Sequence, residues 1–178
     1  MKYILGLLIL ISVVSVGYFK YNLGTTATTM TNNLLDASST GISQITSSIY
    51  GNVNTTDLIL SNNSISSLPS QIGNMTKVII FRIDHNNLQG SLAAEIRQMT
   101  QLKVLDASYN NMTGVPAEIG QLTKLQSLDL SNNKISNLPN ELSNLKNNLK
   151  VLNLKGNPFT QAQISKLQSS LPKTTIIF

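Results

Sequence analysis

The sequence has no cysteine and no tryptophan, and only 5% of its 178 residues are aromatic. Without cysteine, disulfide bonds and metal–thiolate sites are excluded, so the ends of the fold must be sealed by packing. The shortage of aromatic residues implies a core built mainly from aliphatic side chains. The chain also holds a single histidine, His85, which leaves few ways to build an acid–base or metal-binding site.

Charge is scarce and unevenly distributed. Only 12% of the residues are charged, and the net charge is +5. The charges balance up to Gly120, whereas the part that follows has seven lysines but only two acids, Asp129 and Glu141. These lysines could face an anionic polymer or lipid head groups, and the alternative is an ordinary solvated surface. The lysines considered are Lys124, Lys146, Lys150, Lys155, Lys166 and Lys173.

Long apolar runs are also absent, except between Lys2 and Lys20. As a helix, the uncharged run Tyr3–Phe19 would measure about 25 Å, which is the lower limit for spanning a bilayer. We therefore expect residues 1–19 to be a signal peptide or transmembrane anchor, with an uncleaved hydrophobic helix favoured over cleavage after Gly17. Residues 20–31 are polar and threonine-rich and are expected to form a flexible linker.

One pattern recurs every 23 or 24 residues through the rest of the chain. In LQSLDLSNNKISNLP (125–139), apolar residues alternate at Leu128 and Leu130, as in a strand, and the alternation breaks at Asn133. Each copy needs neighbours stacked on it to bury its apolar side. Five clear copies each carry an asparagine after the apolar pair, at Asn63, Asn86, Asn110, Asn133 and Asn157.

The spacing L-x-x-L-x-L-x-x-N-x-L resembles the leucine-rich repeat family over residues 32–178. The absence of cysteine favours a bacterial type. The resemblance implies an α/β solenoid, a short horseshoe of about six coils with a parallel β-sheet on the concave side. The prolines after Leu68, Val115 and Leu138 cannot donate to a sheet, so these stretches are expected to form helical or 3₁₀ segments on the convex side.

Both ends of the repeat domain depart from the pattern. Leu35-Asp36-Ala37-Ser38 matches residues 105–108 letter for letter, so a degenerate first copy precedes the five clear ones. Residues 160–178 are expected to cap the other end, because Ile164, Leu167 and Leu171 share one face of a predicted amphipathic helix. A final strand is expected to follow this helix.

The resemblance also implies roles for particular residues. The five asparagines are expected to point inward and form a ladder that satisfies backbone groups of their own and adjacent coils. Strand residues between the leucines point to the concave face, where the family binds its partners. We expect Arg82 to lie beside Asp106, either within a specific site or as a solvated pair worth less than about 1 kcal/mol. The candidate ligand-binding residues are Arg82, Asp84, His85, Asp106, Tyr109 and Asp129.

These observations predict a non-enzymatic module, displayed outside the cytoplasmic membrane, that recognises a protein or another cell-surface ligand. It would be membrane-anchored through residues 3–19, or secreted after cleavage. The alternatives are a structural or adhesive envelope component that self-associates, and a cytoplasmic scaffold. An enzyme is not expected, because no serine is placed as a nucleophile near His85. We expect no cofactor, no metal and no nucleic-acid partner, and a monomeric chain.

Overall fold

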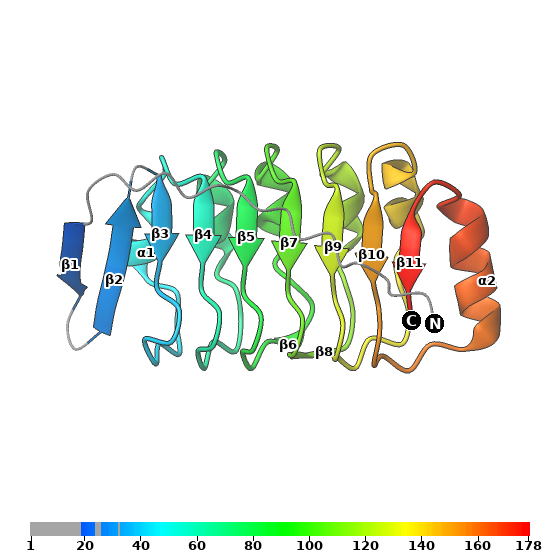
Figure 1. Cartoon of the computed structure of the whole chain (residues 1–178), viewed down its shortest axis with the longest axis horizontal. Helices are drawn as coiled ribbons and strands as arrows, with labels where there is room; N and C mark the ends of the chain where they lie inside the picture. The colour runs from blue at the N-terminus through cyan, green and yellow to red at the C-terminus, as the bar shows by residue number, and fades with distance from the viewer. Residues whose placement is uncertain (1–18, 24–25, 32) are drawn as a thin grey trace, which may run out of the picture.

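The computed structural model describes residues 19–23, 26–31 and 33–178. The predicted signal peptide or hydrophobic anchor helix therefore lies outside the described residues, apart from Phe19. Within the described ranges, no helix is both long enough and apolar enough to cross a membrane. Figure 1 shows an elongated molecule in which the strands stand side by side in chain order, with short helices behind them.

The sheet is the main feature of this solenoid. Its order is β1-β2-β3-β4-β5-β7-β9-β10-β11, and neighbours from β3 onward are parallel. One three-residue strand comes from each coil, as the repeat pattern predicts. These strands are β3 (Leu34–Asp36), β4 (Asp57–Ile59), β5 (Ile80–Arg82), β7 (Val104–Asp106), β9 (Ser127–Asp129), β10 (Val151–Asn153) and β11 (Thr175–Ile177).

The core is a continuous column of aliphatic side chains behind the sheet. The middle residue of each strand from β3 to β10 is fully buried, and the register places these residues next to one another: Leu35, Leu58, Phe81, Leu105, Leu128 and Leu152. Their neighbours in the strands point to the other side, because side chains alternate along a strand. The concave face therefore carries polar residues such as Arg82 and Asp106 together with apolar ones such as Ile59 and Val104.

Four 3₁₀ helices form the convex side, as predicted. They are η1 (Ser70–Asn74), η2 (Ala94–Gln98), η3 (Ala117–Gln121) and η4 (Asn140–Leu145). Three of them begin directly after an extended proline, and η2 begins after Ala93. Apolar residues such as Ile72 and Met75 point inward and are fully buried. The first coil instead carries the short helix α1 (Ser47–Tyr50).

The N-terminal end differs from the expectation of a flexible linker over residues 20–31. The structure places two strands there, β1 (Phe19–Leu23) and β2 (Thr26–Thr31), which pair antiparallel with each other. β2 also pairs antiparallel with β3. The run of threonines suits a strand, because β-branched residues favour extended backbone, and the hairpin covers the edge of β3 that would otherwise be open.

At the C-terminal end, α2 (Gln161–Ser170) is followed by β11, the predicted final strand. Thr160 and Gln163 form a capping box at the start of α2. Leu171 is buried against the core, whereas Ile164 and Leu167 are only half-buried. A second small sheet, β6 (Gln89–Gly90) with β8 (Asn111–Met112), was not expected from the sequence.

Candidate functional site

The asparagines of the repeat lie between successive coils. Asn110 is representative: its Nδ2 donates to the carbonyl of Ala107 in its own coil and to that of Ile83 in the preceding coil, at 3.2 and 3.0 Å. Its Oδ1 accepts from the backbone N–H of Leu88 at 2.9 Å. The other four asparagines make the corresponding bonds: Asn63, Asn86, Asn133 and Asn157. These bonds hold the strand ends in register and so position the concave face.

Acidic residues on the concave face are held by a repeated Asp-x-Ser motif. The Oδ1 of Asp106 accepts from the backbone N–H and the hydroxyl of Ser108, at 3.1 and 2.7 Å. Asp36 and Asp129 accept in the same way from the serine two positions later. Each carboxylate therefore has a fixed orientation. Asp36 and Asp106 are bonded through Oδ1, whereas Asp129 also accepts from Asn153 Nδ2 through Oδ2, at 2.9 Å.

All five aspartates of the sequence belong to this face, whereas the three glutamates lie in the first turns of η2, η3 and η4. Asp106 and Asp129 are directly paired neighbours in the sheet. Burial raises the pKa of Asp106, and the nearby carboxylates of Asp84 and Asp129 raise it further, while the hydrogen bonds from Ser108 oppose the shift. The centre of the face therefore gathers the carboxylates of Asp84, Asp106 and Asp129.

Arg82 lies opposite Asp106 in the sheet register, as predicted. Within the described part of the chain, however, the one acid–base contact within 4.0 Å is between His85 and Asp84. Arg82 and Asp106 do not form the ion pair that the sequence suggested as an alternative. Arg82 is exposed, whereas Asp106 is half-buried. The arginine side chain therefore extends into solvent.

An aromatic stack lies at the end of the acidic row. The rings of His85 and Tyr109 are 4.3 Å apart and nearly parallel, at 15°. His85 Nδ1 lies at hydrogen-bond distance, 2.9 Å, from Asp84 Oδ2, and Ser61 Oγ donates to the other oxygen of Asp84. Tyr109 is 51% exposed and the side chain of His85 is 50% exposed. The structure thus brings Asp84, His85 and Tyr109 together.

The sequence did not reveal the backbone conformation beneath this stack. His85 and Tyr109 have positive φ angles, 53° and 52°, as do Asn62 and Asn132 at the same position of the flanking coils. Asparagine tolerates this left-handed region, whereas a bulky tyrosine there is uncommon. The sequence did contain a signal for this conformation. Asn62, Asn132 and Gly156 occupy, in the flanking coils, the same repeat position as His85 and Tyr109 in the central coils.

The contacts on this face show which chemistry its side chains can offer. His85 contacts the carboxylate of Asp84 and stacks on the ring of Tyr109. Within the described ranges, no group of three His, Cys, Asp or Glu side chains is arranged to hold a metal ion. What the arrangement offers is fixed carboxylates beside an exposed aromatic stack, which is chemistry for binding.

Comparison with known proteins agrees with the fold. Residues 54–75 match the family model "Leucine Rich Repeat", and residues 100–147 match "Leucine Rich repeats (2 copies)". No curated protein matches the chain.

Among solved structures, a leucine-rich repeat protein of Leptospira interrogans is 32% identical with a TM-score of 0.74, over 77% of this chain and 34% of that one. The chain therefore spans about a third of that relative. A chain of the BIR3–SERK2 complex of Arabidopsis thaliana is 27% identical with a TM-score of 0.59, over 71% of this chain and 68% of that one. The ectodomain of the Arabidopsis receptor kinase GASSHO1/SCHENGEN3, solved in complex with CASPARIAN STRIP INTEGRITY FACTOR 2, is 31% identical with a TM-score of 0.61, over 71% and 16%.

Proposed function

We propose, from the premise that this chain is a leucine-rich repeat protein, that its concave face recognises a protein partner and performs no catalysis. The fold itself suits protein–protein recognition, since among the described residues no other element covers the concave face of the open parallel sheet. The similar plant ectodomain bound to CASPARIAN STRIP INTEGRITY FACTOR 2 is consistent with this use of the fold. Display outside the cytoplasmic membrane is part of the proposal and is supported by the apolar run Tyr3–Phe19.

The observation that carries the proposal is the exposed His85–Tyr109 stack next to the carboxylates of Asp84, Asp106 and Asp129. Aromatic rings and carboxylates together recognise cationic groups, the rings through their faces and the carboxylates through charge-assisted hydrogen bonds. Tyrosine is also among the residue types that dominate binding energy at interfaces. The partner that fits is therefore a protein segment rich in lysine or arginine.

The dimensions of the face limit the size of this segment. The parallel strands from β3 to β11, at about 4.8 Å spacing, span roughly 29 Å, and four residues of each coil span about 13 Å. The projected area is on the order of 400 Å², against about 800 Å² per partner in a standard interface. A short basic segment, rather than a whole folded domain, matches this area.

A binding measurement with synthetic peptides tests the proposal. Peptides of equal length, either rich in Lys and Arg or rich in Asp and Glu, are titrated against the full-length chain. We expect binding of the basic peptides only. Tyr109→Asn should lower the affinity at least about tenfold, because losing a tyrosine that dominates binding costs about 1.4 kcal/mol or more. Asparagine is chosen because it tolerates the left-handed backbone at this position.

The matched control is Gln71→Ala, an exposed residue of η1 on the convex side. We expect it to leave the affinity for basic peptides unchanged. Equal binding of acidic and basic peptides, or equal affinity of Tyr109→Asn and the wild type, would show that the concave face is not the recognition surface.

Self-association is the second candidate, and a specific feature favours it. β11 is the last strand of the sheet, and Ile177 and Phe178 at this end are exposed. Open strand edges with apolar residues can pair with another copy of the chain. Sedimentation velocity of the full-length chain distinguishes the two: the recognition module sediments as a monomer at all concentrations, whereas an adhesive component forms concentration-dependent oligomers that Ile177→Lys abolishes.

A further inference from the structure

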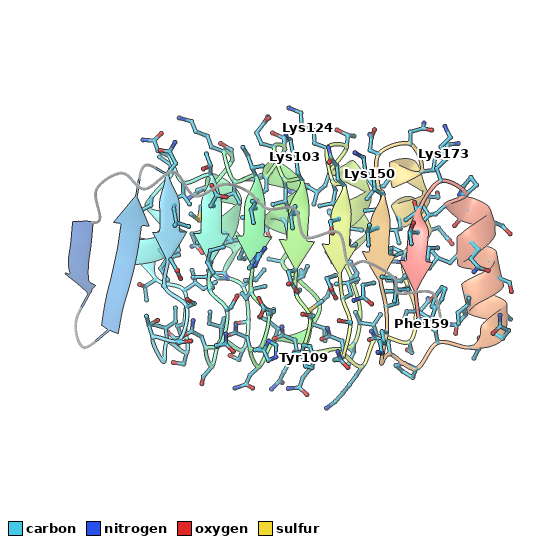
Figure 2. The ribbon with its side chains drawn as sticks, in the orientation of Figure 1. Lys103, Tyr109, Lys124, Lys150, Phe159 and Lys173 are labelled. Atoms are coloured by element: carbon cyan, nitrogen blue, oxygen red, sulfur yellow. The ribbon has the colours of Figure 1, made fainter. Side chains whose placement is uncertain are left out.

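A hollow lined by lysines lies at the edge of the solenoid where the strands begin. Lys103, Lys124 and Lys150 line it, and the rest of its lining is neutral and polar, with Gln126 and Asn147 among it. Its volume is about 240 Å³. Figure 2 shows Lys103, Lys124, Lys150 and Lys173 along this edge, and Tyr109 at the opposite edge. The hollow is therefore separate from the candidate recognition site.

Backbone hydrogen bonds fix the spacing of these lysines. The carbonyl of Lys103 accepts from the N–H of Gln126 at 2.9 Å, and the carbonyl of Gln126 accepts from the N–H of Lys150 at 2.8 Å. The three residues thus form a row at the spacing of adjacent strands, which puts Lys103 and Lys150 about 10 Å apart at the backbone. Lys124 precedes Gln126 by two residues, and its Nζ donates to Gln101 Oε1. Three lysines therefore line one polar hollow, and the ammonium of Lys124 is held by a side-chain amide.

No carboxylate offsets this charge in the part of the chain that the structure describes. The hollow has no acidic lining residue, and none of its three lysines lies within 4.0 Å of an acid among the described residues. Like charges held close together repel one another, and an anion between them relieves the repulsion. From this geometry we infer that the hollow binds a sulfate or phosphate ester group of an anionic polysaccharide.

The shape and lining of the edge favour this partner over a membrane or a single-stranded nucleic acid. The labelled lysines follow a line from β7 to β11 (Figure 2), which suits a linear polyanion. Insertion into a lipid interface uses exposed apolar side chains, and the large hydrophobic residues exposed in the described chain do not line the hollow: Val53, Tyr109, Ile177 and Phe178. Single-stranded nucleic acids need aromatic side chains on which bases stack, and the lining of the hollow contains none.

The test is a titration of the full-length chain with dextran sulfate, with neutral dextran as the uncharged probe. We expect binding of dextran sulfate only, and a loss of at least about tenfold when Lys103, Lys124 and Lys150 are all changed to glutamine. The matched control changes Lys134, Lys155 and Lys166 to glutamine, which lowers the net charge equally but lies outside the lining. This control should lose less than about threefold, because distant exposed charges are screened by salt.

Equal losses in the two triple variants would reduce the effect to overall charge and overturn the inference, as would an unchanged affinity in the first variant. Two further arms use vesicles containing phosphatidylglycerol and a single-stranded oligodeoxynucleotide. Tighter binding of either probe than of dextran sulfate, lost in the hollow variant alone, would replace the polysaccharide with that partner. Thermal midpoints of both triple variants should match the wild type, since exposed substitutions change stability little.

Discussion

At the level of single residues, the unusual feature is a tyrosine and a histidine in left-handed backbone. The other coils adopt the same backbone at this position with Ser39, Asn62, Asn132 and Gly156, and asparagine and glycine do so at low cost. Strained residues persist where the surrounding structure holds them, and they gather at functional sites. The Asn110 bonds and the hydrogen bond from Tyr109 N to the carbonyl of Ser131 hold this turn. The backbone is shared by every coil, so the exposed stack of the two rings is what assigns His85 and Tyr109 to binding.

The asparagine ladder makes a prediction for stability. Changing Asn110 to leucine removes the donor to Ile83 and Ala107 and leaves the buried N–H of Leu88 without an acceptor. We expect the free energy of unfolding to fall by about 1–3 kcal/mol, the cost of leaving buried polar groups unsatisfied. Urea unfolding measures this change.

The control is Asn144→Leu, at an exposed position of η4. Its expected effect lies within about 0.5 kcal/mol, as for other exposed substitutions. If Asn110→Leu unfolded at the same urea concentration as Asn144→Leu, the asparagines would not be structural.

Asp106 makes a pH-dependent prediction. Burial raises its pKa in the folded chain, so the ionised carboxylate opposes folding at pH values above the folded-state pKa. This penalty disappears as the pH falls below the ordinary aspartate value, because both states are then protonated. Asp106→Asn keeps an acceptor for Ser108 and removes the charge. We therefore expect its urea midpoint to exceed that of the wild type at pH 7 and to match it at pH 3.

Asp36→Asn is the matched control for this measurement. Asp36 accepts the same two hydrogen bonds from Ser38, but the residue opposite it in β4 is Ile59 rather than a carboxylate. We expect a smaller gain at pH 7 than for Asp106→Asn. A wild-type advantage over Asp106→Asn at neutral pH would contradict the assigned cause of the shift.

At the level of secondary-structure elements, the repeat period predicted most of the fold. The steps between Asn63, Asn86 and Asn110 are the steps between strands, and the register pairs Leu58 with Phe81 and Phe81 with Leu105. Periodicity succeeds here because each coil contacts only its neighbours, so local spacing determines the global arrangement. The 3₁₀ helices were predicted from the prolines, which cannot donate to a sheet.

Elements outside the repeat pattern could not be predicted in this way. The β1–β2 hairpin depends on pairing with β3, and no internal copy of it exists to compare. The β6–β8 pair depends on Gly90, which adopts a φ of 64° and turns the chain toward Met112. In the candidate site, the residues were predicted from their column, but the His85–Tyr109 stack depends on side-chain geometry that spacing does not contain.

Close contact between successive 3₁₀ helices gives a third prediction. Gly120 of η3 is buried, and a methyl group there would overlap the backbone carbonyl of Glu141 in η4. We expect Gly120→Ala to lower the free energy of unfolding by about 1–3 kcal/mol, the usual cost of overpacking.

Gly114 provides the comparison, since nothing lies within 4 Å of the methyl group that alanine would add and its φ is not in the left-handed region. Gly114→Ala should be neutral or stabilise the protein by up to about 1 kcal/mol, because alanine restricts the unfolded chain. Equal midpoints for the two variants in guanidinium unfolding would show that the convex helices are loosely packed.

At the level of the whole molecule, charge of opposite sign is divided between two surfaces. The concave face holds all five aspartates against the cations Arg82 and Lys155, whereas the lysine hollow has no acid in its lining. The net charge of +5 gives no indication of this division. The repeat architecture allows it, because each coil contributes one residue to each column and every column can be given its own chemistry without disturbing the core.

This division predicts that the two proposed sites act independently. Tyr109 and the lysine row lie at opposite edges of the solenoid (Figure 2), and no residue lines both sites. Substitutions at separated sites without shared partners have additive effects. The triple lysine variant should therefore bind basic peptides as the wild type does, and Tyr109→Asn should bind dextran sulfate as the wild type does, each within about twofold. Combining the four substitutions should then reproduce both separate losses. If the lysine substitutions alone changed the peptide affinity, one continuous surface would serve both ligands.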